Sequence, residues 1–146
     1  MKSKPSLPGL KRKAREIVVK TLYEMEMGCL DKTGARERVM KKCRRPQSQT
    51  FAMRLLNETM AHSEEADKII AKVAENWHLS RMAAIDRNVL RLGTVELVFM
   101  DEVPEKVAIN EAIEIAKRFS TENSGRFVNG ILDKVARLKR EVRGNI

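Results

Sequence analysis

The sequence predicts an all-α protein of six or seven helices, and three observations support this fold class. Aromatic residues make up only 4% of the 146 residues, glycine and proline are few, and helix-forming residue types dominate. Apolar residues recur at spacings of three and four, which places them on one face of a helix. No segment alternates between apolar and polar residues as a half-buried strand would.

The N-terminal part contains two prolines and a glycine within residues 1–10, which predicts a flexible basic arm. A helix is expected to begin near Lys11 and to end at Gly28, so that residues 11–146 form a single helical domain. The apolar face of this helix contains Val18, Leu22, Met25 and Cys29.

The middle of the chain predicts three further helical stretches. A short basic helix precedes Pro46, and a longer stretch runs from Ser48 to Trp77 with a break near Ala61 to Ser63. Ser80 then suits the N-cap of a helix with apolar residues on two sides, which is typical of a central helix. The two sides are Ile85, Val89, Leu92 and Phe99, and Leu90, Leu97 and Met100.

Two helices complete the predicted fold. Pro104 suits the first turn of one helix, and Ser124 suits the N-cap of the last helix. Gly130 lies inside this last helix, where it costs up to about 1 kcal/mol relative to alanine. We therefore expect Gly130 to permit a close approach between helices.

The net charge of +9 is unevenly distributed. Residues 1–20 carry seven basic residues and one acid, residues 32–54 carry eight and one, and residues 125–146 carry six and two. These segments sum to +17, and the remainder of the chain carries −8. This segregation indicates an anionic partner, and lysines and arginines in the first turns of a helix point the same way because they oppose the helix dipole.

Several function classes are disfavoured by the sequence. No apolar run is long enough to span a membrane, and a cytoplasmic location is expected. Cys29 and Cys43 lack the spacing of a metal site, and we expect both to be reduced, with no metal or cofactor bound. His62 and His78 are isolated, and no catalytic motif is present, so an enzyme is not expected.

Three segments resemble the NusB family. The strongest likeness is VPEKVAINEAIEIAKRF followed by RFVNGILDKVARL, which joins two helices and their loop in order. Upstream, AAIDRNVLRLGTVEL resembles the central helix of that family, and KRKAREIVVKTLYEME resembles its arginine-rich first helix. The likeness is weaker between residues 29 and 79.

This resemblance implies a fold of two small helical bundles and a transcription antitermination factor. Such a factor recognises boxA-type single-stranded RNA in nascent transcripts, together with NusE, which is also a ribosomal small-subunit protein. It acts within an antitermination complex on RNA polymerase, notably during ribosomal RNA synthesis.

The resemblance also implies candidate RNA-binding residues. They are Lys11, Arg12, Lys13 and Arg15 in the first helix, Arg91 in the central helix, and Asn123, Arg126 and Phe127 around the last loop. Asn123 stands where the family commonly has Asp, and this loss of a negative charge beside the RNA path is expected to raise RNA affinity or lessen dependence on the partner. Gly93 and Thr94 stand where bulkier residues are usual.

Simpler interpretations compete at these positions. The basic cluster is also typical of a solvated charge run, and Phe127 is also typical of a core aromatic residue. Arg91 is equally suited to pairing with an acid such as Asp86 or Glu96.

The acidic stretch from Asp101 to Glu122 contains six acids and three bases, and it suits a basic protein partner. We expect Glu111 and Glu114 to face NusE. Alternatives to the RNA-binding factor are a protein interaction module that does not contact RNA, and a detached domain related to those fused to RNA cytosine methyltransferases. The sequence also leaves open whether the free protein forms a homodimer.

Overall fold

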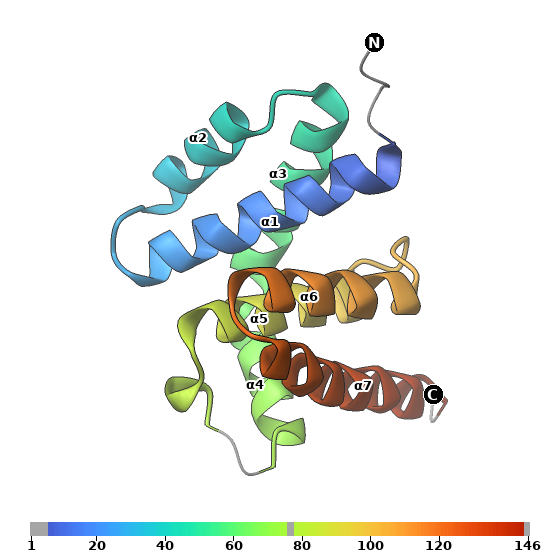
Figure 1. Ribbon diagram of the computed structural model, residues 1–146. Coiled ribbons are helices and arrows are strands. Elements are labelled where there is room, and N and C mark those ends of the chain that lie inside the picture. The colour runs from blue at the N-terminus through green and yellow to red at the C-terminus, as the bar shows by residue number, and fades with distance from the viewer. Residues whose placement is uncertain (1–5, 76–77, 145–146) are drawn as a thin grey trace. The chain divides into compact units, whose positions relative to one another are not determined.

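The computed structural model describes residues 6–75 and 78–144, and all regular elements in these ranges are helical. They are α1 (Leu7–Glu26), α2 (Lys32–Lys42), α3 (Pro46–Ala61), α4 (Ser63–Val73), the short 3₁₀ helix η1 (Leu79–Arg81), α5 (Ala84–Phe99), α6 (Glu105–Phe119) and α7 (Glu122–Gly144) (Figure 1). The chain divides into two compact units, one up to Asn57 and one from Glu58. The all-α prediction, with two small bundles, is confirmed.

The predicted helical stretch from Ser48 corresponds to α3 and α4, with the break at His62. Trp77, at the predicted end of that stretch, lies outside the described residues. Among the described residues, no helix has the length and apolar character that crossing a membrane requires.

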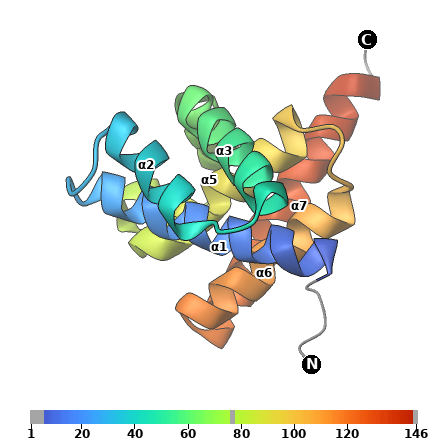
Figure 2. The same cartoon turned by 90° about the horizontal axis from the view of Figure 1, so that it is seen from above.

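The first unit contains α1, α2 and most of α3. α1 begins at Leu7 rather than near Lys11, because the Ser6 hydroxyl accepts a hydrogen bond from the Gly9 amide at 3.1 Å and caps the helix. Residues 7–10 are therefore helical where a flexible arm was expected. After α1 the chain reverses at Gly28, whose positive φ of 80° suits glycine, and α2 then packs against α1 (Figure 2).

The second unit is built around α5, which packs against α4, α6 and α7. Both predicted apolar sides of α5 are buried: Val89 and Leu92 on one, and Leu90 and Leu97 on the other, are at most 2% exposed. The prediction of a central helix is confirmed.

Gly93, not Gly130, provides the close helix contact in this unit. A Cβ atom on Gly93 would lie 2.8 Å from Cδ1 of Leu132, so α5 and α7 approach where α5 has no side chain. A Cβ atom on Gly130 would meet no atom within 4 Å. The expectation for Gly130 is therefore wrong, because periodicity along one helix does not reveal which position meets the neighbour.

Two predicted N-caps also differ from the structure. The capping oxygen of α7 belongs to Thr121, which accepts a hydrogen bond from the Ser124 amide at 3.1 Å. The Ser124 hydroxyl instead donates to Oδ2 of Asp86 at 3.1 Å and so connects α7 with α5. Ser80 lies within η1, and α5 begins only at Ala84.

Candidate nucleic-acid interface

The basic cluster near the start of α1 divides into two kinds of side chain. Arg12 and Lys13 are exposed, whereas Lys11 is half-buried and Arg15 is only 2% exposed. The spacing of four residues puts Lys11 and Arg15 on one face of α1, and both lie over the ring of Phe51 in α3. Their charged groups are 5.2 and 4.9 Å from the ring centroid.

This cation–π contact helps to stabilise the buried guanidinium of Arg15. Nothing in the local sequence pattern of α3 indicates that a cation covers the Phe51 ring. Arg12 and Lys13 are therefore the members of the cluster best placed for an anion in solvent. Lys13 Nζ lies 3.9 Å from a carboxylate oxygen of Glu16, which is a weak pair at an exposed lysine.

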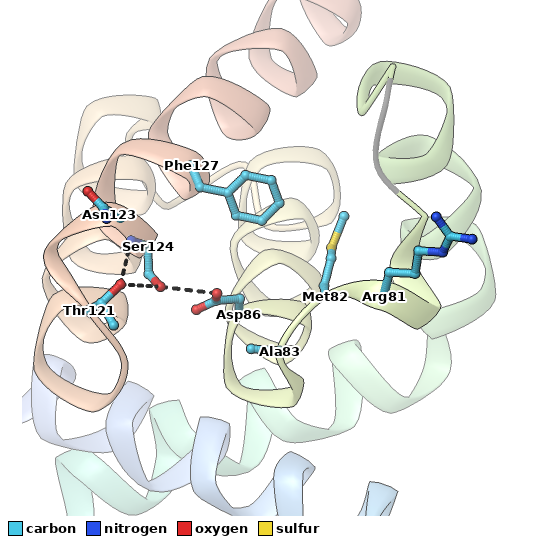
Figure 3. Close-up of a pocket in the computed structure, with 8 residues that line it drawn as sticks. All are labelled: Arg81, Met82, Ala83, Asp86, Thr121, Asn123, Ser124 and Phe127. Carbon is cyan, nitrogen blue, oxygen red and sulfur yellow. Dashed lines mark hydrogen bonds between the residues drawn. The ribbon is translucent and has the colours of Figure 1, made fainter.

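The second unit brings two further candidates, Asn123 and Phe127, to one pocket of about 320 Å³ (Figure 3). Both come from the start of α7, and the Phe127 ring points across the pocket toward Met82 (Figure 3). The pocket is lined by Arg81, Met82, Ala83, Asp86, Thr121, Asn123, Ser124 and Phe127. Arg126 is exposed and lies outside this lining.

Asp86 gives the pocket a polar wall. It is 8% exposed, and its Oδ2 accepts the hydrogen bond from Ser124. Its Oδ1 is buried and accepts no hydrogen bond from the described residues. The half-buried ring of Phe127 offers a flat apolar face in this pocket, on which a planar group such as a nucleobase can stack.

Arg91 is held by a carboxylate, as the alternative interpretation expected, but the carboxylate belongs to Asp67 of α4. Nε donates to Oδ1 at 2.7 Å, and Nη2 donates to Oδ2 at 3.0 Å. This two-point pair joins α5 to α4. Asp67 was not among the acids named from the sequence, because its proximity to Arg91 arises only when α4 packs on α5.

The acidic candidates Glu111 and Glu114 lie three residues apart on α6 and therefore share a face. Glu114 is exposed, with Nζ of Lys117 at 3.9 Å from its carboxylate, and Glu111 is half-buried. They remain candidates for contact with a basic partner.

The structure also bears on metal and thiol chemistry. Within residues 6–75 and 78–144, no group of three or more His, Cys, Asp or Glu side chains could hold a metal ion. Cys29 is exposed and Cys43 is buried, both as free thiols. Burial raises the pKa of the Cys43 thiol, and the positive charge of Lys13 partly offsets this rise in pKa.

A comparison with known proteins identifies a family that matches this chain. A sequence model of the NusB family matches residues 12–137. The transcription antitermination protein NusB of Salinibacter ruber is 48% identical over 127 residues, covering 86% of this chain and 79% of the relative. NusB of Myxococcus xanthus is 41% identical over 133 residues, covering 88% and 95%.

Solved structures agree with the sequence comparison. NusB of T. maritima superposes with a TM-score of 0.78 at 36% identity, covering 94% of this chain and 93% of the other. A chain from a complex of the antitermination factors NusB and NusE with double-stranded RNA gives a TM-score of 0.80 at 26% identity, covering 88% and 97%.

Proposed function

Because the chain belongs to the NusB family, we propose that it is a transcription antitermination factor that binds boxA-type single-stranded RNA together with NusE. It acts in the cytoplasm within the antitermination complex of RNA polymerase and supports ribosomal RNA transcription. Its role is binding rather than catalysis. That residues 11–146 act as a single functional domain stays a prediction.

The observation that carries this proposal is the position of Arg12 and Lys13 in α1. Both are exposed near the N-terminal end of a 20-residue helix that has no acid in its first turn. The two cationic side chains therefore place positive charge on an exposed surface of the first unit, where an anion in solvent can bind. RNA phosphates supply that anion.

The pocket beside Phe127 is proposed to receive an unpaired RNA base. The Phe127 ring offers a face on which the base can stack, and Asn123 places a neutral polar group at the rim of the pocket. Arg126 adds a cation on the exposed surface next to it. Arg91 contributes to RNA binding indirectly, because its ion pair with Asp67 holds α5 against α4. Stacking requires unpaired bases, which is why we propose single-stranded RNA although the related complex contains double-stranded RNA.

The test is fluorescence anisotropy with three RNAs: a boxA oligonucleotide, a scrambled sequence and a boxA duplex, each with and without NusE. The variant Arg12→Ala/Lys13→Ala should reduce the slope of log K against log salt by about 1.4, at about 0.7 for each phosphate that is no longer neutralised. The matched control is Lys68→Ala/Lys72→Ala, which removes two exposed charges from α4. Equal slopes for the two variants would refute the assignment of α1.

Glu111 and Glu114 are proposed to bind NusE, which requires a basic surface on that partner. Reversing both charges to lysine should weaken NusE binding and leave binding to RNA alone unchanged, because neither residue belongs to α1 or lines the pocket beside Phe127. Unchanged NusE affinity would show that this face of α6 is not the contact. Gel filtration with and without RNA tests the remaining prediction of a homodimer.

A further inference from the structure

A second basic site lies in the first unit, between α1 and α2. It is a pocket of about 260 Å³ whose lining contains four cationic side chains and one carboxylate, a net charge of +3. The lining residues are Lys13, Ile17, Lys20, Thr21, Glu24, Arg38 and Lys42. Only Lys13 belongs to the basic cluster described above, so most of this charge has no role in the function proposed so far.

The residues from α1 form one stripe. Positions 13, 17, 20 and 24 are spaced by three and four, and they follow the face of α1 that meets α2. At a rise of about 1.5 Å per residue, Lys20 lies about 10 Å beyond Lys13 along the helix axis. The stripe therefore extends the cationic surface of α1 away from its N-terminus and into the pocket.

Arg38 is fixed by the one carboxylate in the lining. Its Nη1 lies 2.8 Å from Oε1 and 2.6 Å from Oε2 of Glu24, which ties α2 to α1 and neutralises one positive charge. Thr21 is also committed, because its hydroxyl donates to the Ile17 carbonyl at 2.7 Å. The other cationic side chains of the lining are its three lysines, of which Lys13 also lies 3.9 Å from a carboxylate oxygen of Glu16.

A structural role at the C-terminal end of α2 is the main alternative for Lys42, because cations there complement the helix dipole. The carbonyl groups at this end have another donor. Nε2 of Gln49 lies 2.7 Å from the Cys43 carbonyl oxygen and 3.4 Å from the Met40 carbonyl oxygen. Lys42 is thus not needed to satisfy them, and its exposed side chain lines the pocket instead.

We infer that the pocket between α1 and α2 binds a phosphate group, and that this phosphate belongs to the backbone of the RNA held at the start of α1. Lysine ammonium groups are compact donors that suit phosphate oxygens. Because Lys13 contributes to both sites, one strand can pass from the first to the second. The RNA part of this inference rests on the proposed function.

The decisive variant is Lys20→Gln/Lys42→Gln, which removes two charges that line the pocket. The matched control is Lys32→Gln/Lys41→Gln, two exposed lysines of α2 outside the lining. All four positions are exposed, so thermal unfolding should show that both proteins remain folded. Binding of boxA single-stranded RNA is measured by anisotropy over a salt series.

The pocket variant is expected to reduce the slope of log K against log salt by about 0.7 relative to the unaltered protein, because one phosphate is no longer neutralised, and the control is expected to leave it unchanged. Equal slopes for the pocket variant and the control would overturn the assignment of an RNA phosphate.

A second arm separates this inference from the proposed function. Inorganic phosphate is titrated into isotopically labelled protein, and the amide resonances of α1 and α2 are followed by NMR. Shifts confined to the pocket and abolished in Lys20→Gln/Lys42→Gln would support a phosphate site. If phosphate binds there while the RNA slope is unaffected, the ligand is a free phosphate and the RNA assignment is wrong.

The two proposals then fail in different ways. A protein that binds no RNA overturns the proposed function and the RNA source of the phosphate, and the titration still decides whether the pocket binds phosphate. The absence of both the slope change and the amide shifts overturns the site itself.

Discussion

Gly93 of α5 faces Leu132 of α7 so closely that a Cβ atom at Gly93 would lie 2.8 Å from Cδ1 of Leu132. Both residues are in the second unit, and Leu132 is fully buried. We predict that Gly93→Ala lowers the free energy of unfolding by about 1–3 kcal/mol, because a side chain is forced into a packed interface. Urea denaturation monitored by circular dichroism measures this change.

Gly130→Ala is the matched control, since it adds the same methyl group to a helix at a place with no atom within 4 Å. It should stabilise the protein by up to about 1 kcal/mol, because alanine is the better helix former. Destabilisation at both positions, or at neither, would contradict the packing described for α5 and α7.

The long helices of this protein could be predicted from the sequence because they bury regular stripes of apolar residues. The features that depend on a neighbouring helix could not. Gly130 looked like the contact glycine, and Ser124 looked like the cap of α7, yet Gly93 and Thr121 have these roles. One-dimensional spacing identifies a face, but not the residue opposite it.

The candidate site could likewise be predicted only in part. The cations of α1 were visible as a run in the sequence, and the likeness to NusB indicated Asn123 and Phe127. The partners of the cations were not visible: Phe51 lies on α3 and Asp67 on α4, far in sequence from the arginines that they hold. The pocket between α1 and α2 was missed because its lysines come from two separate charge runs, which meet only after those helices pack.

Arg15 and Arg12 should differ in what their removal affects. Arg15 is buried over Phe51, so Arg15→Ala is expected to lower the free energy of unfolding by about 1–3 kcal/mol, because packing and cation–π attraction are both removed. Arg12 is exposed, so Arg12→Ala should alter stability by less than about 0.5 kcal/mol while weakening RNA binding. Thermal unfolding and anisotropy on both variants check this. Equal stabilities would show that Arg15 is not a structural cation.

Arg91→Lys tests whether Arg91 acts through its pair with Asp67. Lysine keeps the positive charge but cannot donate in two parallel bonds to one carboxylate. We expect the free energy of unfolding to fall by about 1 kcal/mol, and the salt slope of RNA binding to stay unchanged. Arg137→Lys, at an exposed position of α7, is the control. An RNA affinity that falls with no change in stability would instead mark Arg91 as a direct contact.

The two cysteines should differ in reactivity because burial raises the pKa of the Cys43 thiol. Near pH 8, iodoacetamide is expected to alkylate the exposed Cys29 first, with Cys43 reacting only after local opening. Since Lys13 partly offsets the effect of burial, Lys13→Gln should raise the pKa of Cys43 further. Mass spectrometry of alkylated peptides over a pH series measures both effects.

The same shift in pKa makes stability depend on pH. The raised pKa means that the folded protein favours the neutral thiol, so the stabilisation is fully present below the pKa of the unfolded thiol, about 8.5, and is lost as pH rises through the folded value. Replacing Cys43 with alanine should remove this part of the alkaline loss of stability. A variant with an unchanged alkaline profile would show that Cys43 does not titrate in this way.

Asn123→Asp should weaken RNA binding by restoring a negative charge at the rim of the pocket. Asn123 is exposed and lines this pocket together with Phe127 and the buried carboxylate of Asp86, so a second carboxylate would repel an incoming phosphate from the same side. For two charges about 4 Å apart in bulk water the cost is about 1 kcal/mol, or about fivefold in Kd at low salt. Screening should reduce the difference as salt increases, which anisotropy at two salt concentrations measures. Asn110→Asp adds the same charge to the exposed surface of α6 and should leave Kd unchanged. If both variants weakened binding equally, the effect would follow net charge alone, and the place of Asn123 beside the RNA would be refuted.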